Sequence, residues 1–141
     1  MTTHAHPTTR RALSTERAPA PAGGYSQGIA AGPYVFTSGF GPQDPETGAV
    51  ADTVEEQTRQ VLRNVRSVLE EAGLGLDDVV KATVHLQHLH RDFAGFDRVY
   101  REHFSDPRPV RTTVGSDLMN ILVEIDVVAL HRPAPAPDPA G

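Results

Sequence analysis

The residues best suited to do chemistry in this chain are Arg111 and Glu124, which lie thirteen residues apart. Arg111 belongs to residues 108–114, whose pattern predicts the opening of a β-strand, and Glu124 belongs to residues 121–130, the most strand-like segment of the chain. Two strands joined by a short loop bring an arginine and a carboxylate to one cleft. A guanidinium at the mouth of an apolar cleft holds a small carboxylate with two parallel hydrogen bonds. The pair therefore predicts a protein that acts on a small carboxylate-bearing molecule.

Both residues also have an ordinary structural interpretation. Residue type alone does not decide between that interpretation and a functional one. A surface or structural ion pair is the more common role of a lone arginine in a strand, and it is the alternative for Arg111. Alternation along residues 121–130 places Glu124 on the same face as Leu122 and Asp126, where it either holds or activates a water molecule or simply faces solvent or a subunit interface. A carboxylate amid Ile, Leu and Val is unusual enough to keep it as a candidate.

Ser38 and Gly39 end an apolar strand, where a serine can donate a hydrogen bond and a glycine lets a ligand approach the backbone closely. A plain strand-ending turn is the alternative. No Ser/His/Asp set is obvious in the sequence, so a serine nucleophile is not expected. His85, His88 and His90 cluster at another strand end, but their spacing matches no metal-binding motif, and we expect no metal site.

Composition narrows the class of protein. The chain has 141 residues, a formal net charge of −5 and no cysteine, which fits one domain without disulfides, a thiolate nucleophile or a zinc–thiolate site. Lys and Arg are scattered, so nucleic acid is not expected as the main partner. No secretory signal is visible and no segment approaches the roughly 20 apolar residues of a membrane span, so we expect a cytoplasmic protein that does not enter a membrane.

The segmentation predicts one folded domain over residues 23–130, between a flexible N-terminal tail, residues 1–22, and a Pro/Ala-rich C-terminal tail, residues 131–141. A capping pair, Thr53 with Glu56, opens the first of two expected helices, and Asp92 is expected to cap the second. In chain order, the expected elements are strands 25–30 and 34–38, helix 53–72, strand 79–87, helix 92–104, strand 111–114 and a last strand within 118–130. This β-β-α-β-α-β-β order indicates an α+β fold with one mixed sheet and both helices on one face.

Taken together, these segments resemble the Rid (YjgF) family of reactive intermediate deaminases. The matching stretches cover nearly all of the predicted domain in the family's order: residues 24–28, 35–39, 57–73, 79–84, 93–104, 111–114 and 123–129. The resemblance implies a chorismate-mutase-like fold and a homotrimer with clefts between subunits.

In the family's active members, an arginine that matches Arg111 binds the substrate carboxylate, and a glutamate that matches Glu124 positions the attacking water. Tyr25, Ser38 and Gly39 match further positions of the cleft. The implied reaction is hydrolysis of enamine or imine intermediates, such as 2-aminoacrylate, to 2-oxo acids and ammonia without a metal or organic cofactor. An imine carbon is already electrophilic, so holding the carboxylate and placing one water molecule is sufficient.

The chain departs from the family pattern around this cleft. Asp97 stands where many members have asparagine, and its charge either repels a carboxylate substrate or favours an amine-bearing one. Thr113 stands where some members carry cysteine, and the connection over residues 115–120 is short. Two alternatives therefore stay open: a pathway-specific enzyme, such as a cyclase or tautomerase, that uses the same cleft, and a non-enzymatic small-ligand or RNA-associated regulator.

Overall fold

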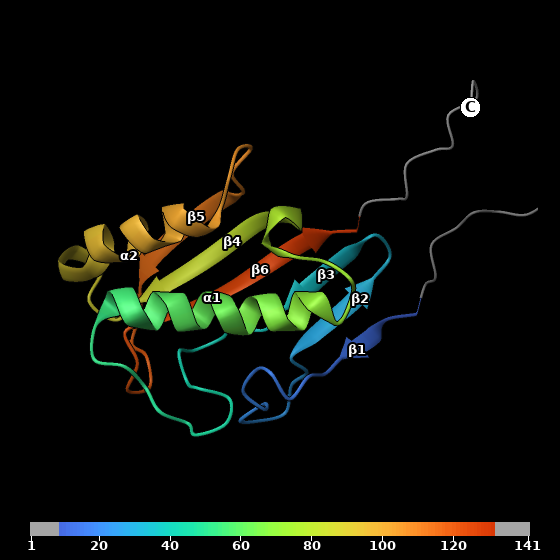
Figure 1. The fold of residues 1–141 in the computed structure, drawn as a ribbon, viewed down its shortest axis with the longest axis horizontal. Helices are drawn as coiled ribbons and strands as arrows, with labels where there is room; N and C mark the ends of the chain where they lie inside the picture. The colour runs from blue at the N-terminus through green and yellow to red at the C-terminus, as the bar shows by residue number, and fades with distance from the viewer. Residues whose placement is uncertain (1–8, 132–141) are drawn as a thin grey trace, which may run out of the picture.

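The computed structural model describes residues 9–131, which form one six-stranded mixed sheet with two helices lying across one of its faces (Figure 1). The α+β class and the placement of both helices on one face are therefore confirmed. Residues 132–141 of the expected C-terminal tail, and residues 1–8, lie outside the described part of the chain. The elements are β1 (Arg11–Leu13), β2 (Gly28–Ala31), β3 (Tyr34–Thr37), α1 (Val54–Glu70), a short 3-10 turn (Leu76–Asp78), β4 (Val79–Leu86), α2 (Leu89–His103), β5 (Val110–Gly115) and β6 (Val123–Leu130).

The strand order across the sheet is β1-β2-β3-β6-β4-β5. All neighbours are antiparallel except β4 and β5, which run parallel because α2 carries the chain back to the start of the sheet before β5 begins. The last two strands of the chain are not neighbours, since β6 inserts between β3 and β4 and β5 occupies the outer edge. This order determines which strands are neighbours, and the registers between them determine which side chains share a face.

Helix α1 follows its sequence signals closely. The side chain of Thr53 accepts a hydrogen bond from the backbone N–H of Glu56 at 3.2 Å, as the capping pair predicts. The apolar stripe of α1, Val61, Leu62, Val65, Val68 and Leu69, is fully buried against the sheet. Beyond the last turn, Gly73 adopts a left-handed φ of 74°, a conformation that glycine allows at little cost.

Helix α2 begins earlier than its sequence suggests. Its N-cap is His88, so the expectation that Asp92 caps it is wrong; Asp92 lies inside the first turn and accepts a hydrogen bond from Arg91 at 2.8 Å. The apolar residues Phe96, Val99 and Tyr100 of α2 are buried, whereas Phe93 is 39% exposed. The helix stops at His103, ahead of the two prolines expected to end it.

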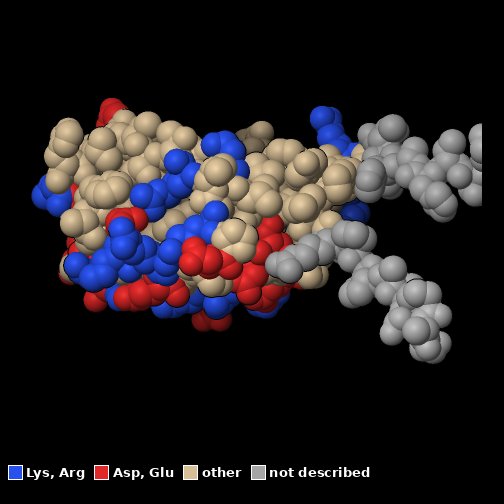
Figure 2. All heavy atoms as spheres, turned by 90° about the horizontal axis from the view of Figure 1, so that it is seen from above, with Lys and Arg blue, Asp and Glu red and all other residues tan. Residues whose placement is uncertain are grey.

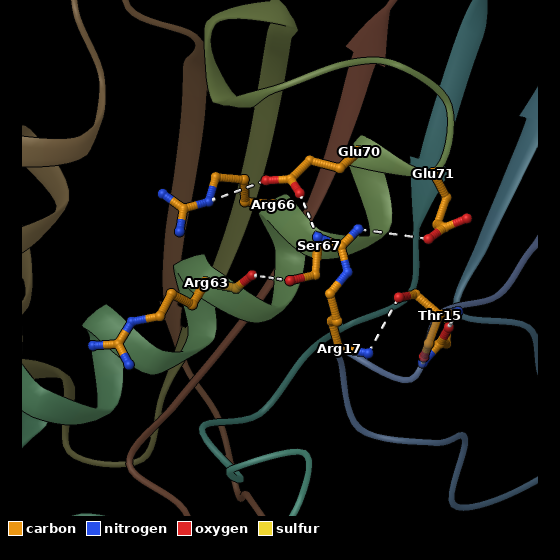
Figure 3. Close-up of polar contacts among 8 residues, drawn as sticks. Thr15, Arg17, Arg63, Arg66, Ser67, Glu70 and Glu71 are labelled. Carbon is orange, nitrogen blue, oxygen red and sulfur yellow. Dashed lines mark hydrogen bonds and ion pairs between the residues drawn. The ribbon is translucent and has the colours of Figure 1, made fainter.

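The N-terminal boundary expected at residue 22 is also wrong, because β1 pairs with β2 and buries Leu13. Farther along, Arg17 forms an ion pair with Glu70 of α1 at 2.8 Å and lies 3.6 Å from Glu71 (Figure 3). Its backbone N–H donates to the hydroxyl of Thr15 at 3.1 Å. Residues 11–22 are therefore part of the fold.

The face of the sheet that no helix covers carries ionisable side chains, among them Lys81, His85 and Glu124, beside exposed apolar ones. The alternation predicted for the last strand is confirmed, with Val123, Ile125 and Val127 buried toward the helices. Seen from above, acidic and basic residues gather along the helix side of the molecule, whereas the side behind the sheet is mostly uncharged (Figure 2). The exposed apolar side chains on this open face are Tyr34, Phe36, Val110, Val114 and Leu130. Within residues 9–131, no helix is long and apolar enough to cross a bilayer.

Candidate functional site

A cavity of about 560 Å³ collects four of the candidate residues: Tyr25, Ser38, Gly39 and Glu124. A volume of this size accommodates a small organic molecule. Its walls come from three segments that lie far apart in the chain, residues 19–22, 40–43 and 117–121. Residues 19–22 precede β2, residues 40–43 follow β3 and residues 117–121 precede β6, so the cavity lies at one end of these three strands. We call this cavity the glutamate pocket.

The carboxylate of Glu124 lies directly against Gly39. An isolated β-bridge joins Phe40 to Ile125, with Phe40 N–H donating to the Ile125 carbonyl at 2.9 Å and the reverse bond at 3.1 Å. This bridge holds the chain after β3 beside the start of β6. A Cβ added at Gly39 would stand 2.7 Å from Oε2 of Glu124, closer than any ordinary contact. Glycine is therefore required for the carboxylate to keep this position.

Two hydroxyl groups accompany that carboxylate. Oγ of Ser38 is buried and has no hydrogen-bond partner among the described residues, an arrangement uncommon for a polar atom away from water. The Tyr25 hydroxyl accepts a hydrogen bond from the Ala22 N–H at 2.9 Å, and half of the tyrosine remains exposed at the pocket. That bond fixes the phenol while leaving its proton for another acceptor. The pocket thus presents the Glu124 carboxylate with two potential donors, and the carboxylate of Asp117 lies on its wall.

Arg111 does not reach the glutamate pocket of its own chain. Arg111 pairs with Ala82 of β4, and Ala82 pairs on its other side with Val127, so all three point to the helix-covered face. Glu124 has the opposite parity along β6 and points to the open face. The expectation that Arg111 and Glu124 share one cleft is therefore wrong within a single chain, because β4 separates their strands and the pleat separates their faces.

The partner of Arg111 is Asp97 on α2. Nη1 of Arg111 donates to Oδ1 of Asp97 at 2.8 Å, and Nε of Arg101 donates to Oδ2 at 2.9 Å. Burial works to raise the pKa of Asp97, but the hydrogen bonds and charges of Arg111 and Arg101 hold that pKa below its ordinary value. Asp97 is therefore a carboxylate at neutral pH. Thr113 is half-buried two residues after Arg111 on the same face of β5.

Aromatic rings surround the Arg111 guanidinium. Its Cζ lies 4.6, 5.2 and 5.7 Å from the ring centroids of Tyr100, Phe96 and Phe93, distances at which a cation is attracted to a π face. Burial raises the pKa of Tyr100 to about 12, so its phenol stays neutral. The side chain of Arg111 is only 21% exposed, which means that its conformation is fixed by packing as well as by Asp97.

Buried amides that the sequence reasoning did not single out position the walls of the glutamate pocket. Nε2 of Gln27 donates to carbonyls of residues 15, 18 and 19 at 2.8–3.3 Å, and its Oε1 accepts from the Thr15 N–H at 2.7 Å. Nδ2 of Asn64 donates to the carbonyls of Gly41 and Gln43, both at 3.0 Å. Each amide therefore fixes one wall segment from inside the core.

The third wall is held in the same way. Oε1 of Gln57 accepts from the Leu122 N–H at 2.8 Å, and Oε1 of Gln87 accepts from the Leu118 N–H at 2.6 Å. A signal for two of these residues was present in the sequence: Gln57 and Asn64 are amides inside the apolar stripe of α1, where a polar residue needs buried partners.

The histidine cluster does not converge. His85 lies on β4 with Nδ1 2.6 Å from Oγ of Ser116, His88 precedes α2 and His90 lies within its first turn. Across the described residues, no three His, Asp or Glu side chains are grouped as a metal site requires.

Comparison with known proteins gives one consistent pattern. Residues 15–131 match the family model described as Endoribonuclease L-PSP. A RutC family protein of Pyrococcus abyssi is 42% identical over 85% of this chain and 96% of its own length. The 2-iminobutanoate/2-iminopropanoate deaminase of Salmonella typhimurium is 40% identical over 86% of this chain and 98% of its own length. The crystal structure of E. coli TdcF with bound serine superimposes with a TM-score of 0.80 at 35% identity, over 86% of this chain and 99% of that one.

Proposed function

The chain belongs to the Rid (YjgF) family, as the resemblance indicated, and we propose that it hydrolyses reactive enamine or imine intermediates to 2-oxo acids and ammonia. The observation that carries this proposal is the glutamate pocket, where Glu124, the free buried hydroxyl of Ser38 and Tyr25 face one cavity. The Salmonella relative is named for this reaction, and TdcF holds serine, a small carboxylate with nitrogen on its α-carbon. A substrate of the 2-aminoacrylate type has the same carbon skeleton.

The chemistry requires a held carboxylate and one placed water molecule. Arg111 binds the substrate carboxylate through its guanidinium. Glu124 accepts a hydrogen bond from water and directs its oxygen at the imine carbon, forming a C–O bond as the C=N π electrons move to nitrogen. The proton that water gives up passes to that nitrogen, and the resulting carbinolamine transfers its hydroxyl proton to the same nitrogen, so that ammonia leaves as the C=O of the 2-oxo acid forms. An enamine substrate first shifts a proton from nitrogen to its terminal carbon and so becomes the imine. Ser38 and Tyr25 donate hydrogen bonds to the substrate within the pocket, and Gly39 leaves space for it.

Arg111 and Glu124 act on one substrate only if they come from different copies of the chain. The two residues face opposite sides of one sheet, so a second copy that packs against β5 brings its Glu124 toward the first copy's Arg111. The open face offers a surface for this packing, because exposed aromatic side chains such as Tyr34 and Phe36 favour burial in an interface. We therefore propose a homotrimer whose active sites lie between subunits, with Thr113 and Asp97 beside Arg111 at each site.

The test measures release of 2-oxo acid from 2-aminoacrylate that a serine dehydratase generates in situ. The Arg111→Ala variant should lose acceleration over the spontaneous rate while keeping the oligomeric mass of the parent. Arg108→Ala provides the matched control, because Arg108 is half-exposed in the loop before β5 and pairs only weakly with Asp106, at 3.4 Å. Full activity in Arg111→Ala would overturn the proposed role.

A further inference from the structure

Arg111 is part of a chain of three alternating charges. Asp97 accepts one hydrogen bond from Arg111 on Oδ1 and one from Arg101 on Oδ2, so each carboxylate oxygen is bound to a different guanidinium. The side chain of Asp97 is 16% exposed and that of Arg101 is 70% exposed. The series of charges therefore extends from the sheltered Arg111 to Arg101 at the surface. The Asp97 carboxylate is therefore in direct contact with Arg111, the residue proposed to hold the substrate.

This arrangement restricts how Arg111 can bind a ligand. One N–H of Nη1 is committed to Asp97, and the aromatic rings of α2 fix the plane of the guanidinium. Nε and Nη2 make no hydrogen bond to any described residue, so this edge is the one available for two parallel bonds to a carboxylate. Asp97 therefore orients the arginine.

The same contact also changes the charge that a ligand meets. A carboxylate bound on the free edge of Arg111 shares that guanidinium with the Asp97 carboxylate, and two like charges held by one guanidinium repel inside a sheltered site. A ligand that also carries a cationic nitrogen offsets this repulsion, whereas a simple anion does not. Selection by such a repulsive contact is a common route to specificity.

We propose that Asp97 is a specificity-determining residue that makes Arg111 select zwitterionic carboxylates, such as a protonated 2-imino acid, over simple carboxylate anions. This inference rests on the proposed function and deepens it. A protonated 2-imino acid is a zwitterion, whereas the 2-oxo acid left after hydrolysis is a simple anion. Asp97 therefore favours binding of the substrate and release of the product at the same site.

The experiment titrates the full-length protein with two probes of nearly equal size, L-alanine and L-lactate, and follows binding by NMR. These molecules differ in an ammonium group against a hydroxyl group. The parent should bind alanine more tightly than lactate. Asp97→Asn keeps an oxygen acceptor for Arg111 but removes the charge, so lactate affinity should rise by about tenfold relative to alanine affinity.

Glu102→Gln is the matched control, because it removes one negative charge from the same helix at a residue that only approaches Arg59, at 3.8 Å. It should leave the alanine-to-lactate ratio unchanged. An unchanged alanine-to-lactate ratio in a folded Asp97→Asn variant would overturn the inference. Tighter binding of lactate than of alanine by the parent protein would overturn it as well, and that measurement requires no variant. The Arg111→Ala variant separates the proposed function from the proposed role of Asp97. If Arg111→Ala weakens the binding of neither probe, the proposed function fails. If it weakens the binding of both probes while Asp97→Asn leaves the ratio unchanged, only the role of Asp97 fails.

Discussion

Arg111 and Glu124 lie on opposite faces of one β-sheet, with β4 between the strands that carry them. Arg111 points toward α2 and is bound to Asp97, whereas Glu124 points into a cavity on the open face, beside Gly39. The two residues therefore cannot meet within one chain, and the proposed function requires copies of the chain to associate.

The contact between Gly39 and Glu124 predicts a sharp effect of adding one methyl group. In Gly39→Ala, the new Cβ would lie within 3 Å of two atoms of the Glu124 carboxyl group, which is the mobile end of a side chain and moves aside. We expect kcat for imine hydrolysis to fall at least about tenfold, because misplacing a catalytic group by about an ångström has effects of this size or larger.

Gly24→Ala is the control for that experiment, since a Cβ at Gly24 meets nothing within 4 Å. It should retain the parent's kcat. Equal activity of Gly39→Ala and Gly24→Ala would show that the position of Glu124 does not matter to the reaction.

Phe36 tests the role of the open face. Phe36 is 42% exposed beside Tyr34 on β3, and burial in a subunit interface would account for an aromatic residue at this surface. Phe36→Asp should shift the mass measured by analytical ultracentrifugation toward the monomer and should abolish hydrolysis. Val50→Asp, at a comparably exposed apolar residue in the loop before α1, should do neither. A Phe36→Asp variant with the parent's mass would place the interface elsewhere.

Gln27 should contribute substantially to stability because its side chain bonds to three carbonyls and one N–H of residues 15–19. Replacing it by alanine leaves those backbone groups without their partner, which costs about 2–3 kcal/mol of unfolding free energy. Urea denaturation measures this loss, and cleavage by a protease should begin between residues 11 and 22. Ser26→Ala, at the exposed neighbouring residue, should change neither quantity.

Asp97 predicts a dependence of stability on pH. Its pKa in the folded chain lies below the ordinary value of 3.8, so the ionised carboxylate stabilises the fold above that value, and the contribution disappears as the pH falls through the folded pKa. Asp97→Asn should therefore lower the free energy of unfolding at pH 7 by about 1–2 kcal/mol. The difference should be constant between about pH 5 and 7 and shrink below about pH 4. A difference that grows in acid would have the wrong sign for this account.

Local signals in the sequence predicted the elements well. The Thr53 cap and the apolar spacing after it located α1, and strict alternation placed Glu124 on the face opposite Ile125. Both signals act within a few residues, so no knowledge of the rest of the chain is needed.

The features that sequence reasoning missed depend on contacts between distant segments. Strand β1 has three residues and is recognisable only through its pairing with β2. The separation of Arg111 from Glu124 follows from the insertion of β6 between β3 and β4, which loop length does not reveal. The Asp97–Arg111 pair joins a helix to a strand fourteen residues later, so Asp97 was noticed for its charge and not for its partner.

The most direct test of the central claim mixes two inactive variants, Arg111→Ala and Glu124→Gln, after co-expression with different tags. If each site takes its arginine from one subunit and its glutamate from another, random assembly leaves about one quarter of the sites with both residues intact. We predict that the assembled population recovers about one quarter of the parent's activity, and that the mixed trimers, identified by native mass spectrometry and each with one intact site in three, recover about one third. Mixed oligomers with no more activity than the separate variants would contradict the account, because the two residues would then have to act within one chain.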